Sequence, residues 1–183
     1  ILFVNYGDFT TNSLIHIAGF ANVLCARGHA CVVAVPAGKD TLSVISQPLF
    51  IPATFAEVLA QPGLFPDGRP ADVIHAWTPR EVVRKFVLAH QRLLTAPPRV
   101  IVHLEDNEEF LLERFTGKSL AELQAAGPAE LAALLVDGLP HPWRHRNLLQ
   151  VADGVTIIIE SLRKFVPSSV PVQVLPPGVD FAQ

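Results

Sequence analysis

The sequence predicts a doubly wound α/β domain, in which a parallel sheet carries helices on both of its faces. Short apolar runs of strand length recur along the chain, among them 1–4, 30–35 and 155–159. Stretches with apolar residues at helical spacing, such as 14–25 and 82–94, lie between such runs. Strands that are apolar throughout are typical of a parallel sheet covered on both faces, and helices are the usual connections between its strands.

Composition narrows the classes of function. Half of the 183 residues are hydrophobic and 17% are charged, which excludes a generally disordered chain. The net charge of −3 gives no reason to expect a nucleic acid as partner. No apolar run is long enough to span a membrane, so we expect a cytoplasmic protein. We then expect Cys25 and Cys31 to be reduced core thiols rather than a disulfide or a metal site.

The first 36 residues predict a strand, a loop, a helix and a second strand. Gly7 can adopt the backbone angles of a sharp turn, Asn12 or Ser13 could cap the helix, and Gly28 lies where that helix should end. The loop of Gly7, Asp8, Asn12 and Ser13 could present helix-start amides to a phosphate. A plain turn with a cap is an equally good interpretation, because the loop falls short of G-x-G-x-x-G.

The remainder of the chain continues the alternation. A capping box that begins at Thr78 would place Pro79 at the first helical position, and a second box begins at Ser119. Ser161 could cap a further short helix. In chain order, the expected strands are 49–51, 73–77, 99–104, 155–159 and 172–175, with helices at 54–60 and 79–94, within 106–152 and at 161–165.

Parallel strands joined by right-handed crossovers run in one direction, so their carboxyl ends share one edge of the sheet. Gly7, His75, His103 and Glu160 end or follow four of the expected strands. We therefore expect these residues to cluster at that edge, where open α/β sheets bind their ligands.

The strand that ends at His103 is followed at once by the acidic residues Glu105 and Asp106. Imidazole and carboxylate groups can hydrogen-bond to sugar hydroxyls, so an acceptor site is chemically reasonable here. Acidic residues in a first helical turn also complement the helix dipole without any ligand. We assign the binding role to His103 and Glu105, with Asp106 beside them, and the dipole role to Glu108 and Glu109.

Three further side chains have a structural and a functional interpretation. His75 and Trp77 end a neighbouring strand, where the indole could stack on the apolar face of a sugar, but a Trp in this position is as often a core residue. His16 lies one turn inside the first helix and is expected to be a buried structural histidine. No Asp-x-Asp or paired-His spacing indicates a metal site.

A short basic cluster, Arg144, His145 and Arg146, lies on one of the later helices. A solvated helix face is the default interpretation of such a cluster. Contact with a phosphate or with the surface of a membrane is the alternative, which would make the protein a peripheral membrane protein.

Four segments in order resemble the N-terminal half of the GT-B-fold glycosyltransferases, in the retaining glycogen-synthase-like and sucrose-synthase-like group. The segment 25–32 answers to the pattern ARRGHEV, and 72–77 to DVVHAH. The segment 152–163 answers to ADAVIAVSEALR, and 174–180 to VIPNGVD. Each match is weak alone, but four in the right order across the chain are fairly specific.

The resemblance implies that 1–176 is the Rossmann-like acceptor-side domain of a GT-B fold and that 177–183 begins the linker to a C-terminal domain. That second domain would bind most of a nucleotide diphosphate sugar, which is the co-substrate, and no other cofactor is implied. The acceptor would be a carbohydrate or another small molecule. The enzyme would transfer a glycosyl group to an acceptor hydroxyl with retention, with His103 and Glu105 orienting the acceptor and the loop at Gly7 approaching the donor.

The sequence departs from the family pattern at several points. Gly7 stands alone where the family often has two adjacent glycines, and Pro177 replaces the usual Asn before Gly178. The chain has no Met and begins within a strand-like run, so we expect a part of a longer protein or methionines omitted from the sequence. We expect this part alone to fold, to be inactive as a transferase and to bind nucleotide sugars weakly.

Two other functions remain open at this stage. The chain could be a stand-alone α/β module that binds a ligand or regulates a partner without chemistry of its own. A small hydrolase that uses Glu105 or Asp106 is less well supported, because no Gly-x-Ser-x-Gly turn is present.

Overall fold

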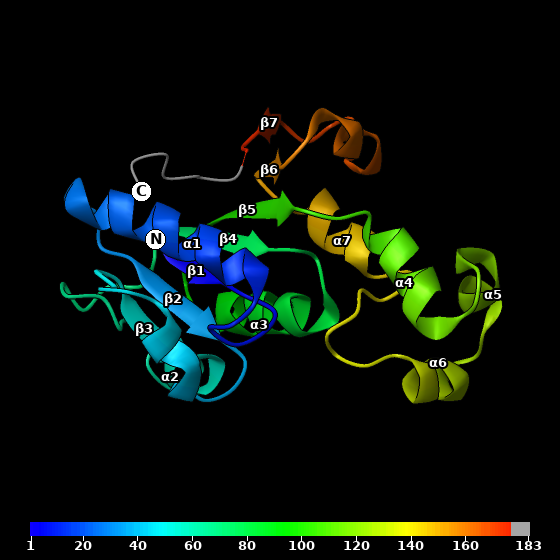
Figure 1. Ribbon diagram of the computed structural model, residues 1–183, viewed down its shortest axis with the longest axis horizontal. Coiled ribbons are helices and arrows are strands. Elements are labelled where there is room, and N and C mark those ends of the chain that lie inside the picture. Colours follow the sequence, from blue (N-terminus) through cyan, green and yellow to red (C-terminus); the bar gives the residue numbers. More distant parts are fainter. Residues whose placement is uncertain (177–183) are drawn as a thin grey trace.

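The computed structural model describes residues 1–176, and it confirms the doubly wound α/β fold with a parallel sheet (Figure 1). The linker expected at 177–183, Pro177 and Gly178, and the end of the segment 174–180 lie outside the described residues. Seven parallel strands form one sheet in the order β3-β2-β1-β4-β5-β6-β7. The strands are β1 (Leu2–Val4), β2 (Val32–Val35), β3 (Ile51–Thr54), β4 (Val73–Trp77), β5 (Arg99–Leu104), β6 (Gly154–Ile157) and β7 (Val172–Val174).

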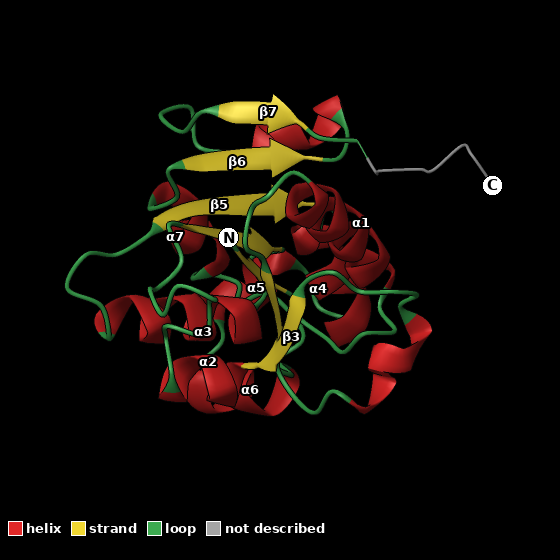
Figure 2. Cartoon of the chain, turned by 90° about the vertical axis from the view of Figure 1, so that its left-hand side faces the viewer, coloured by secondary structure: helices red, strands yellow, loops and turns green. Residues whose placement is uncertain are grey.

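Helices cover both faces of the sheet. Helix α1 lies on one face, and α2 and α3 lie on the other (Figure 2). The helices are α1 (Asn12–Ala26), α2 (Phe55–Ala60), α3 (Glu81–Arg92), α4 (Glu108–Thr116), α5 (Leu120–Ala125), α6 (Pro128–Leu134) and α7 (His145–Gln150), with the 3₁₀ helices η1 (Asp40–Val44) and η2 (Glu160–Phe165).

The alternation of side chains along each strand divides the interior into two cores. Leu2 and Val4 of β1 point into the core beneath α2, α3 and α7, whereas Phe3 points into the core beneath α1. Helix α1 contributes Leu14 and Ile17 to its side, and both are fully buried. The expected run of apolar residues in the strands therefore reflects burial on both faces.

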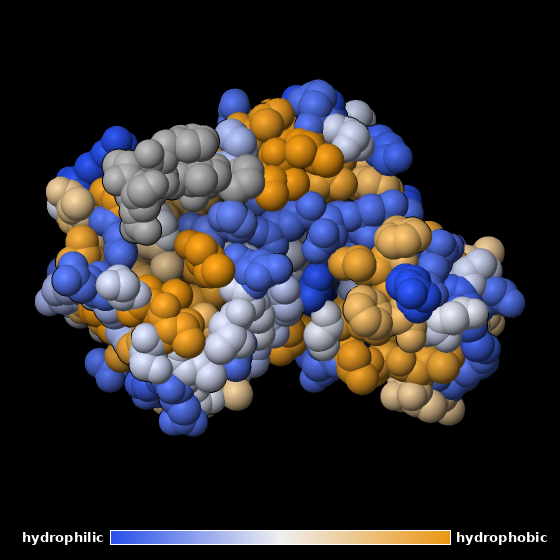
Figure 3. Space-filling model, in the orientation of Figure 1, coloured by the Kyte–Doolittle hydropathy of each residue, from blue (hydrophilic) through white to orange (hydrophobic). Residues whose placement is uncertain are grey.

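Three of the four α-helices between β5 and β6 form a separate projection, which we call the helical lobe (α4, α5 and α6). It has a small core of its own, made of Leu112, Leu123, Leu131 and Leu139. Figure 1 shows the lobe beyond the carboxyl ends of the central strands. Figure 3 shows hydrophobic surface over the part of the molecule that α4 and α6 occupy, next to a hydrophilic band.

Several expected helix signals are confirmed. Ser119 caps α5 in a complete capping box with Glu122. The structure adds two further signals: Pro128 is the first residue of α6, and Thr54 forms a complete capping box at the start of α2. Gly28 follows α1 with a positive φ of 88°, as expected for a glycine at a helix end.

Other cap positions were predicted wrongly. Thr11, rather than Asn12 or Ser13, precedes α1, and the Ser13 side chain is used elsewhere. Ser161 lies inside η2, which begins at Glu160 after Ile159. At Ser13 a hydrogen bond to the distant Glu105 replaces the cap, which a local capping pattern does not report.

The capping box expected at Thr78 is also absent. Thr78 has a φ of 69°, its amide donates to the carbonyl of His103 at 2.9 Å, and α3 begins only at Glu81. The first amides of α3 instead donate to the carbonyls of Leu139 and Asp137, each at 3.0 Å. The α6–α7 connection therefore supplies the acceptors that a side-chain cap would have provided.

Among residues 1–176, no helix combines the length and the apolar character that crossing a membrane would need.

Candidate binding site at the carboxyl edge of the sheet

The loop after β1 is held in place by Asn5. The side chain of this buried residue donates to the carbonyls of Gly7 and Asp8 at 3.1 and 3.2 Å and to the Thr11 hydroxyl at 2.8 Å. Its backbone amide donates to the carbonyl of Ala34 on β2 at 3.0 Å. One amide group thus connects the end of the strand to the start of α1.

Gly7 is required for space rather than for unusual backbone angles, which corrects the expectation from the sequence. Its φ is not positive, but a Cβ atom at this position would lie 2.6 Å from Cγ2 of Thr11. The Asp8 carboxylate turns back to accept from the amide and hydroxyl of Thr10 at 2.9 and 2.6 Å, and these bonds lower its pKa. In this structure the Asp8 carboxylate is therefore engaged within its own loop.

Replacing Asn5 with Ala should lower the free energy of unfolding by about 1 to 3 kcal/mol, because carbonyls in a partly buried turn would lose their donor. Urea denaturation of the two proteins measures this difference. Asn147→Ala is the matched control, since Asn147 is exposed on α7. Equal stability of the Asn5→Ala and Asn147→Ala proteins would contradict the anchoring role of Asn5.

The first turn of α1 meets the end of β5. The Ser13 hydroxyl donates to a carboxylate oxygen of Glu105, 92 residues away in the sequence, and lies 3.5 Å from the Tyr6 hydroxyl. The guanidinium of Arg80 lies over the Tyr6 ring, 3.7 Å from its centroid. We call Tyr6, Ser13, Arg80 and Glu105 the edge cluster. It joins four segments at the carboxyl edge of the sheet.

Arg80 also faces two carboxylates at the start of α4. It lies 3.3 Å from Glu108 and 3.6 Å from the more exposed Asp106. Glu108 is buried, and this burial raises its pKa to about 7, although the charge of Arg80 acts in the opposite direction. Glu108 is thus a buried carboxyl beside Arg80 that gains and loses its proton near pH 7, a role beyond the dipole complement expected from the sequence.

A second group of polar side chains lies on the α1 face of the sheet. Thr156 on β6 hydrogen-bonds to Nε2 of His75 at 3.1 Å and to Nδ1 of His103 at 2.8 Å. Burial lowers the pKa of His75 to about 4 and that of His103 to about 3. The Trp77 ring packs on His103 with a centroid separation of 4.1 Å. Both imidazoles are therefore neutral near pH 7.

The structure separates the expected site residues into buried side chains and side chains that a ligand could reach. His103 and Trp77 are each only 1% exposed, so neither offers a surface to a ligand in this structure. For Trp77 this agrees with the core alternative. His75 lies in the middle of β4, paired with Phe3 and Ile101, and so it does not end the strand as expected. Glu105 is partly exposed and Asp106 is exposed.

The predicted common edge is confirmed, because β1, β4, β5 and β6 are parallel neighbours. Asn12 and Ser13 begin α1 at this edge, and Asn12 is exposed. Glu160 begins η2 after β6, where its carboxylate pairs with Arg163. His16 is half-buried rather than buried, and it lies near enough to His103 to contribute to the lowering of that pKa.

Tyr6, Arg80 and Thr156 were missed as site residues. Only the strand register shows that Thr156 lies beside His103, and only the late start of α3 turns Arg80 toward Tyr6. Over residues 1–176, no three His, Cys, Asp or Glu side chains are arranged to hold a metal ion.

The basic cluster on α7 is paired rather than free. Arg144 lies 3.7 Å from Glu81, and Arg146 pairs with Glu109. His145 is buried and lies 3.5 Å from Glu109. These carboxylates oppose the positive charge, which disfavours the contact with a phosphate or a membrane surface considered from the sequence.

The fold and the edge cluster define an α/β domain with a candidate polar binding site at the carboxyl edge of its sheet. The sequence matches no family model, and no curated protein matches it. Among solved structures, the chain is similar to an alpha-glucosyltransferase in complex with UDP and a 13-mer DNA containing a central A:G mismatch. The TM-score is 0.49 at 14% identity, and the similarity covers 98% of this chain and 40% of that structure's chain.

Proposed function

We propose that this chain is the acceptor-binding N-terminal domain of a GT-B glycosyltransferase. The complete enzyme would transfer a glycosyl group from a nucleotide diphosphate sugar to an acceptor hydroxyl with retention, and it would act in the cytoplasm. The observation that carries the proposal is the position of the family-like segments. The segment 25–32 covers the α1–β2 junction, 72–77 covers β4, and 152–163 covers β6 with η2. Two members of the edge cluster are tied to these elements, since Ser13 lies in the first turn of α1 and Arg80 follows β4.

The edge cluster has the chemistry to orient an acceptor hydroxyl. Glu105 can accept a hydrogen bond from such a hydroxyl with the carboxylate capacity that Ser13 leaves free. The Tyr6 hydroxyl, which lies 3.5 Å from the Ser13 hydroxyl, can also donate or accept. Fixing the acceptor in this way lowers the barrier through positioning, without requiring a strong base. We assign His103 a supporting role, because it is buried behind the cluster with Trp77.

The donor would be bound mainly by a second domain. Glu105 places a carboxylate beside Ser13 in the first turn of α1, where a donor phosphate would otherwise be favoured by the helix dipole. The carboxylate of Asp8 adds negative charge to the same loop. A nucleotide diphosphate should therefore bind this domain weakly, and the domain alone should not transfer sugar.

Glu105→Ala in the complete glycosyltransferase should reduce turnover roughly tenfold to a hundredfold, because one orienting hydrogen bond to a charged group contributes about 1.5 to 3 kcal/mol. The initial rate of glycosyl transfer at saturating donor measures this effect. Asp72→Ala is the matched control, since Asp72 is an exposed acidic residue that directly precedes β4 at the opposite edge. Unchanged kinetics in Glu105→Ala would assign the cluster to structure and remove the proposed acceptor role.

A further inference from the structure

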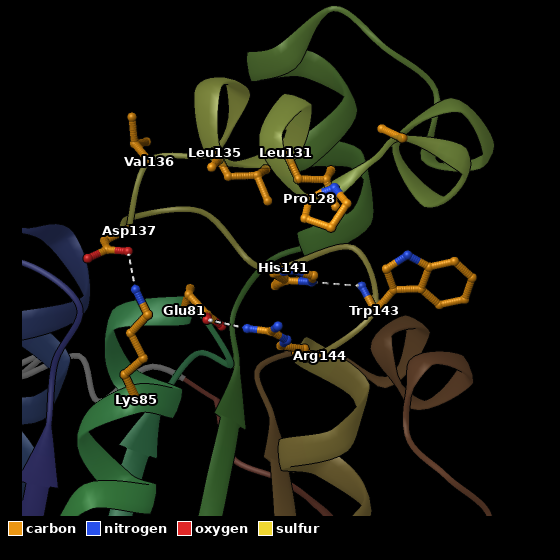
Figure 4. Close-up of a pocket in the computed structure, with 12 residues that line it drawn as sticks. Glu81, Lys85, Pro128, Leu131, Leu135, Val136, Asp137, His141, Trp143 and Arg144 are labelled. Carbon is orange, nitrogen blue, oxygen red and sulfur yellow. Dashed lines mark hydrogen bonds and ion pairs between the residues drawn. The ribbon is translucent and has the colours of Figure 1, made fainter.

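A cavity of about 470 Å³ lies between the helical lobe and the first turns of α3 and α7 (Figure 4). None of the residues proposed above for the acceptor or donor lines it. Its volume falls within the range of small-molecule sites, roughly 300–1,000 Å³. The residues that line it are Glu81, Lys85, Ala126, Pro128, Leu131, Ala132, Leu135, Val136, Asp137, His141, Trp143 and Arg144.

The two sides of the cavity differ in chemistry. Pro128, Leu131 and Leu135, from α6 and the residue that follows it, form an apolar side. Lys85 of α3 and Arg144 beside α7 lie on the opposite side (Figure 4). A ligand that fits must therefore present an apolar face to one wall and hydrogen-bonding groups to the other.

The charges that line the cavity balance one another. Lys85 pairs with Asp137 at 2.7 Å, and Glu81 pairs with Arg84 of α3 at 2.7 Å and lies 3.7 Å from Arg144. Burial lowers the pKa of His141, so this imidazole is neutral near pH 7. Each charged side chain of the lining thus lies within 4 Å of an opposite charge, so the cavity presents no unpaired charge that would call for a charged ligand, and we expect a neutral one.

The cavity is preformed, because the segment between α6 and α7 that borders it is fixed to α3 by hydrogen bonds. The amides of Glu81 and Val82 donate to the carbonyls of Leu139 and Asp137, each at 3.0 Å. At the side of the cavity, Trp143 is 54% exposed, which leaves indole surface open to a ligand (Figure 4). A preformed site binds its ligand without a large loss of conformational entropy in the protein.

We propose that this cavity binds a short neutral oligosaccharide, at a second site separate from the edge cluster. A pyranose ring has an apolar face of C–H groups and a rim of hydroxyls, which matches the two walls. The C–H face would lie against the α6 side or the Trp143 indole, and the hydroxyls would bond to the carboxylates and to Arg144. This site goes beyond the proposed function and does not depend on it.

The test uses the fluorescence of the 183-residue chain. Its two tryptophans differ sharply in exposure, because Trp77 is 1% exposed and Trp143 is 54% exposed. Acrylamide quenching therefore reports mainly on Trp143. The probes are neutral trisaccharides of glucose, galactose and N-acetylglucosamine, with trigalacturonic acid as the charged comparison. At least one neutral trisaccharide should protect Trp143 from quenching, with a Kd near the millimolar range.

Val136→Arg should weaken this binding by about tenfold or more, because Val136 lines the margin of the cavity and a long charged side chain there would obstruct it. Val136 is 65% exposed, so the substitution leaves the core intact. Val151→Arg, at an exposed valine after α7 that does not line the cavity, should bind as the wild type does.

Three results would overturn the proposal: no protection by any neutral trisaccharide at tens of millimolar, equal protection by trigalacturonic acid, or unchanged binding in Val136→Arg. Glu105→Ala should leave the protection of Trp143 unchanged. Loss of transfer in Glu105→Ala and loss of protection in Val136→Arg are thus separate outcomes for separate sites.

Discussion

Replacing both buried histidines, His75 and His103, with uncharged residues should make the chain less sensitive to acid. Between pH 7 and pH 5 the free energy of unfolding should fall by about 3 to 4 kcal/mol less in the double variant than in the wild type. The pKa values of His75 and His103 are lowered in the fold to about 4 and about 3, whereas unfolded histidines titrate near 6.5. Between these values the unfolded chain binds more protons than the folded chain. The contribution of the two histidines to the free energy of unfolding is therefore complete above pH 6.5 and is lost as the pH falls toward 4.

The double variant His75→Gln, His103→Asn is designed to keep the hydrogen bonds to Thr156, since the new amide nitrogens replace Nε2 and Nδ1. Urea denaturation at pH 5 and pH 7 gives the difference in the free energy of unfolding for each protein. His29→Gln, at an exposed histidine, is the control and should behave as the wild type does. The same pH dependence in the double variant and the wild type would show that these histidines are not buried as a neutral pair.

Glu108→Gln should make the stability of the chain less sensitive to alkaline pH, whereas the histidine variant concerns acid pH. Burial raises the pKa of Glu108 from 4.5 to about 7, so the folded chain holds this proton more tightly than the unfolded chain. The contribution of Glu108 is complete below pH 4.5 and is lost as the pH rises through 7. Between pH 5 and pH 8 the wild type should lose roughly 2 to 3 kcal/mol more than Glu108→Gln.

The measurement is again denaturation, at pH 5 and pH 8. Arg80 retains Asp106 at 3.6 Å in the Glu108→Gln protein, so the change does not leave this cation without a partner. Glu130→Gln, on the exposed side of α6, is the control. Parallel pH curves for the wild type and Glu108→Gln would contradict the burial of a titrating carboxyl at this position.

Strand direction and the position of the polar edge could be predicted from the sequence, because both follow from the alternation of apolar runs and helices. The same reasoning placed Ser13 and Glu105 at one edge, and the structure joins them by a hydrogen bond across 92 residues. Capping boxes were reliable where helix and cap are both local, as at Ser119.

The burial of His103 and Trp77 could not be predicted in the same way. It depends on the register of β4 and β5 and on Phe20 of α1, whose ring centroid lies 6.0 Å from that of Trp77. The late start of α3 likewise depends on carbonyls that lie more than 50 residues later in the chain, at Asp137 and Leu139. Such long-range contacts have no local sequence signal.

Amide chemical-shift mapping of the 183-residue chain with a panel of methyl glycosides tests the acceptor role most directly. The account predicts that at least one glycoside shifts the amides of Tyr6, Ser13 and Glu105, and that Glu105→Ala abolishes these shifts. Shifts at Trp143 and its neighbours concern only the second site. The absence of any shift at Tyr6, Ser13 and Glu105 across the panel, at tens of millimolar, would contradict an acceptor site at the carboxyl edge of the sheet.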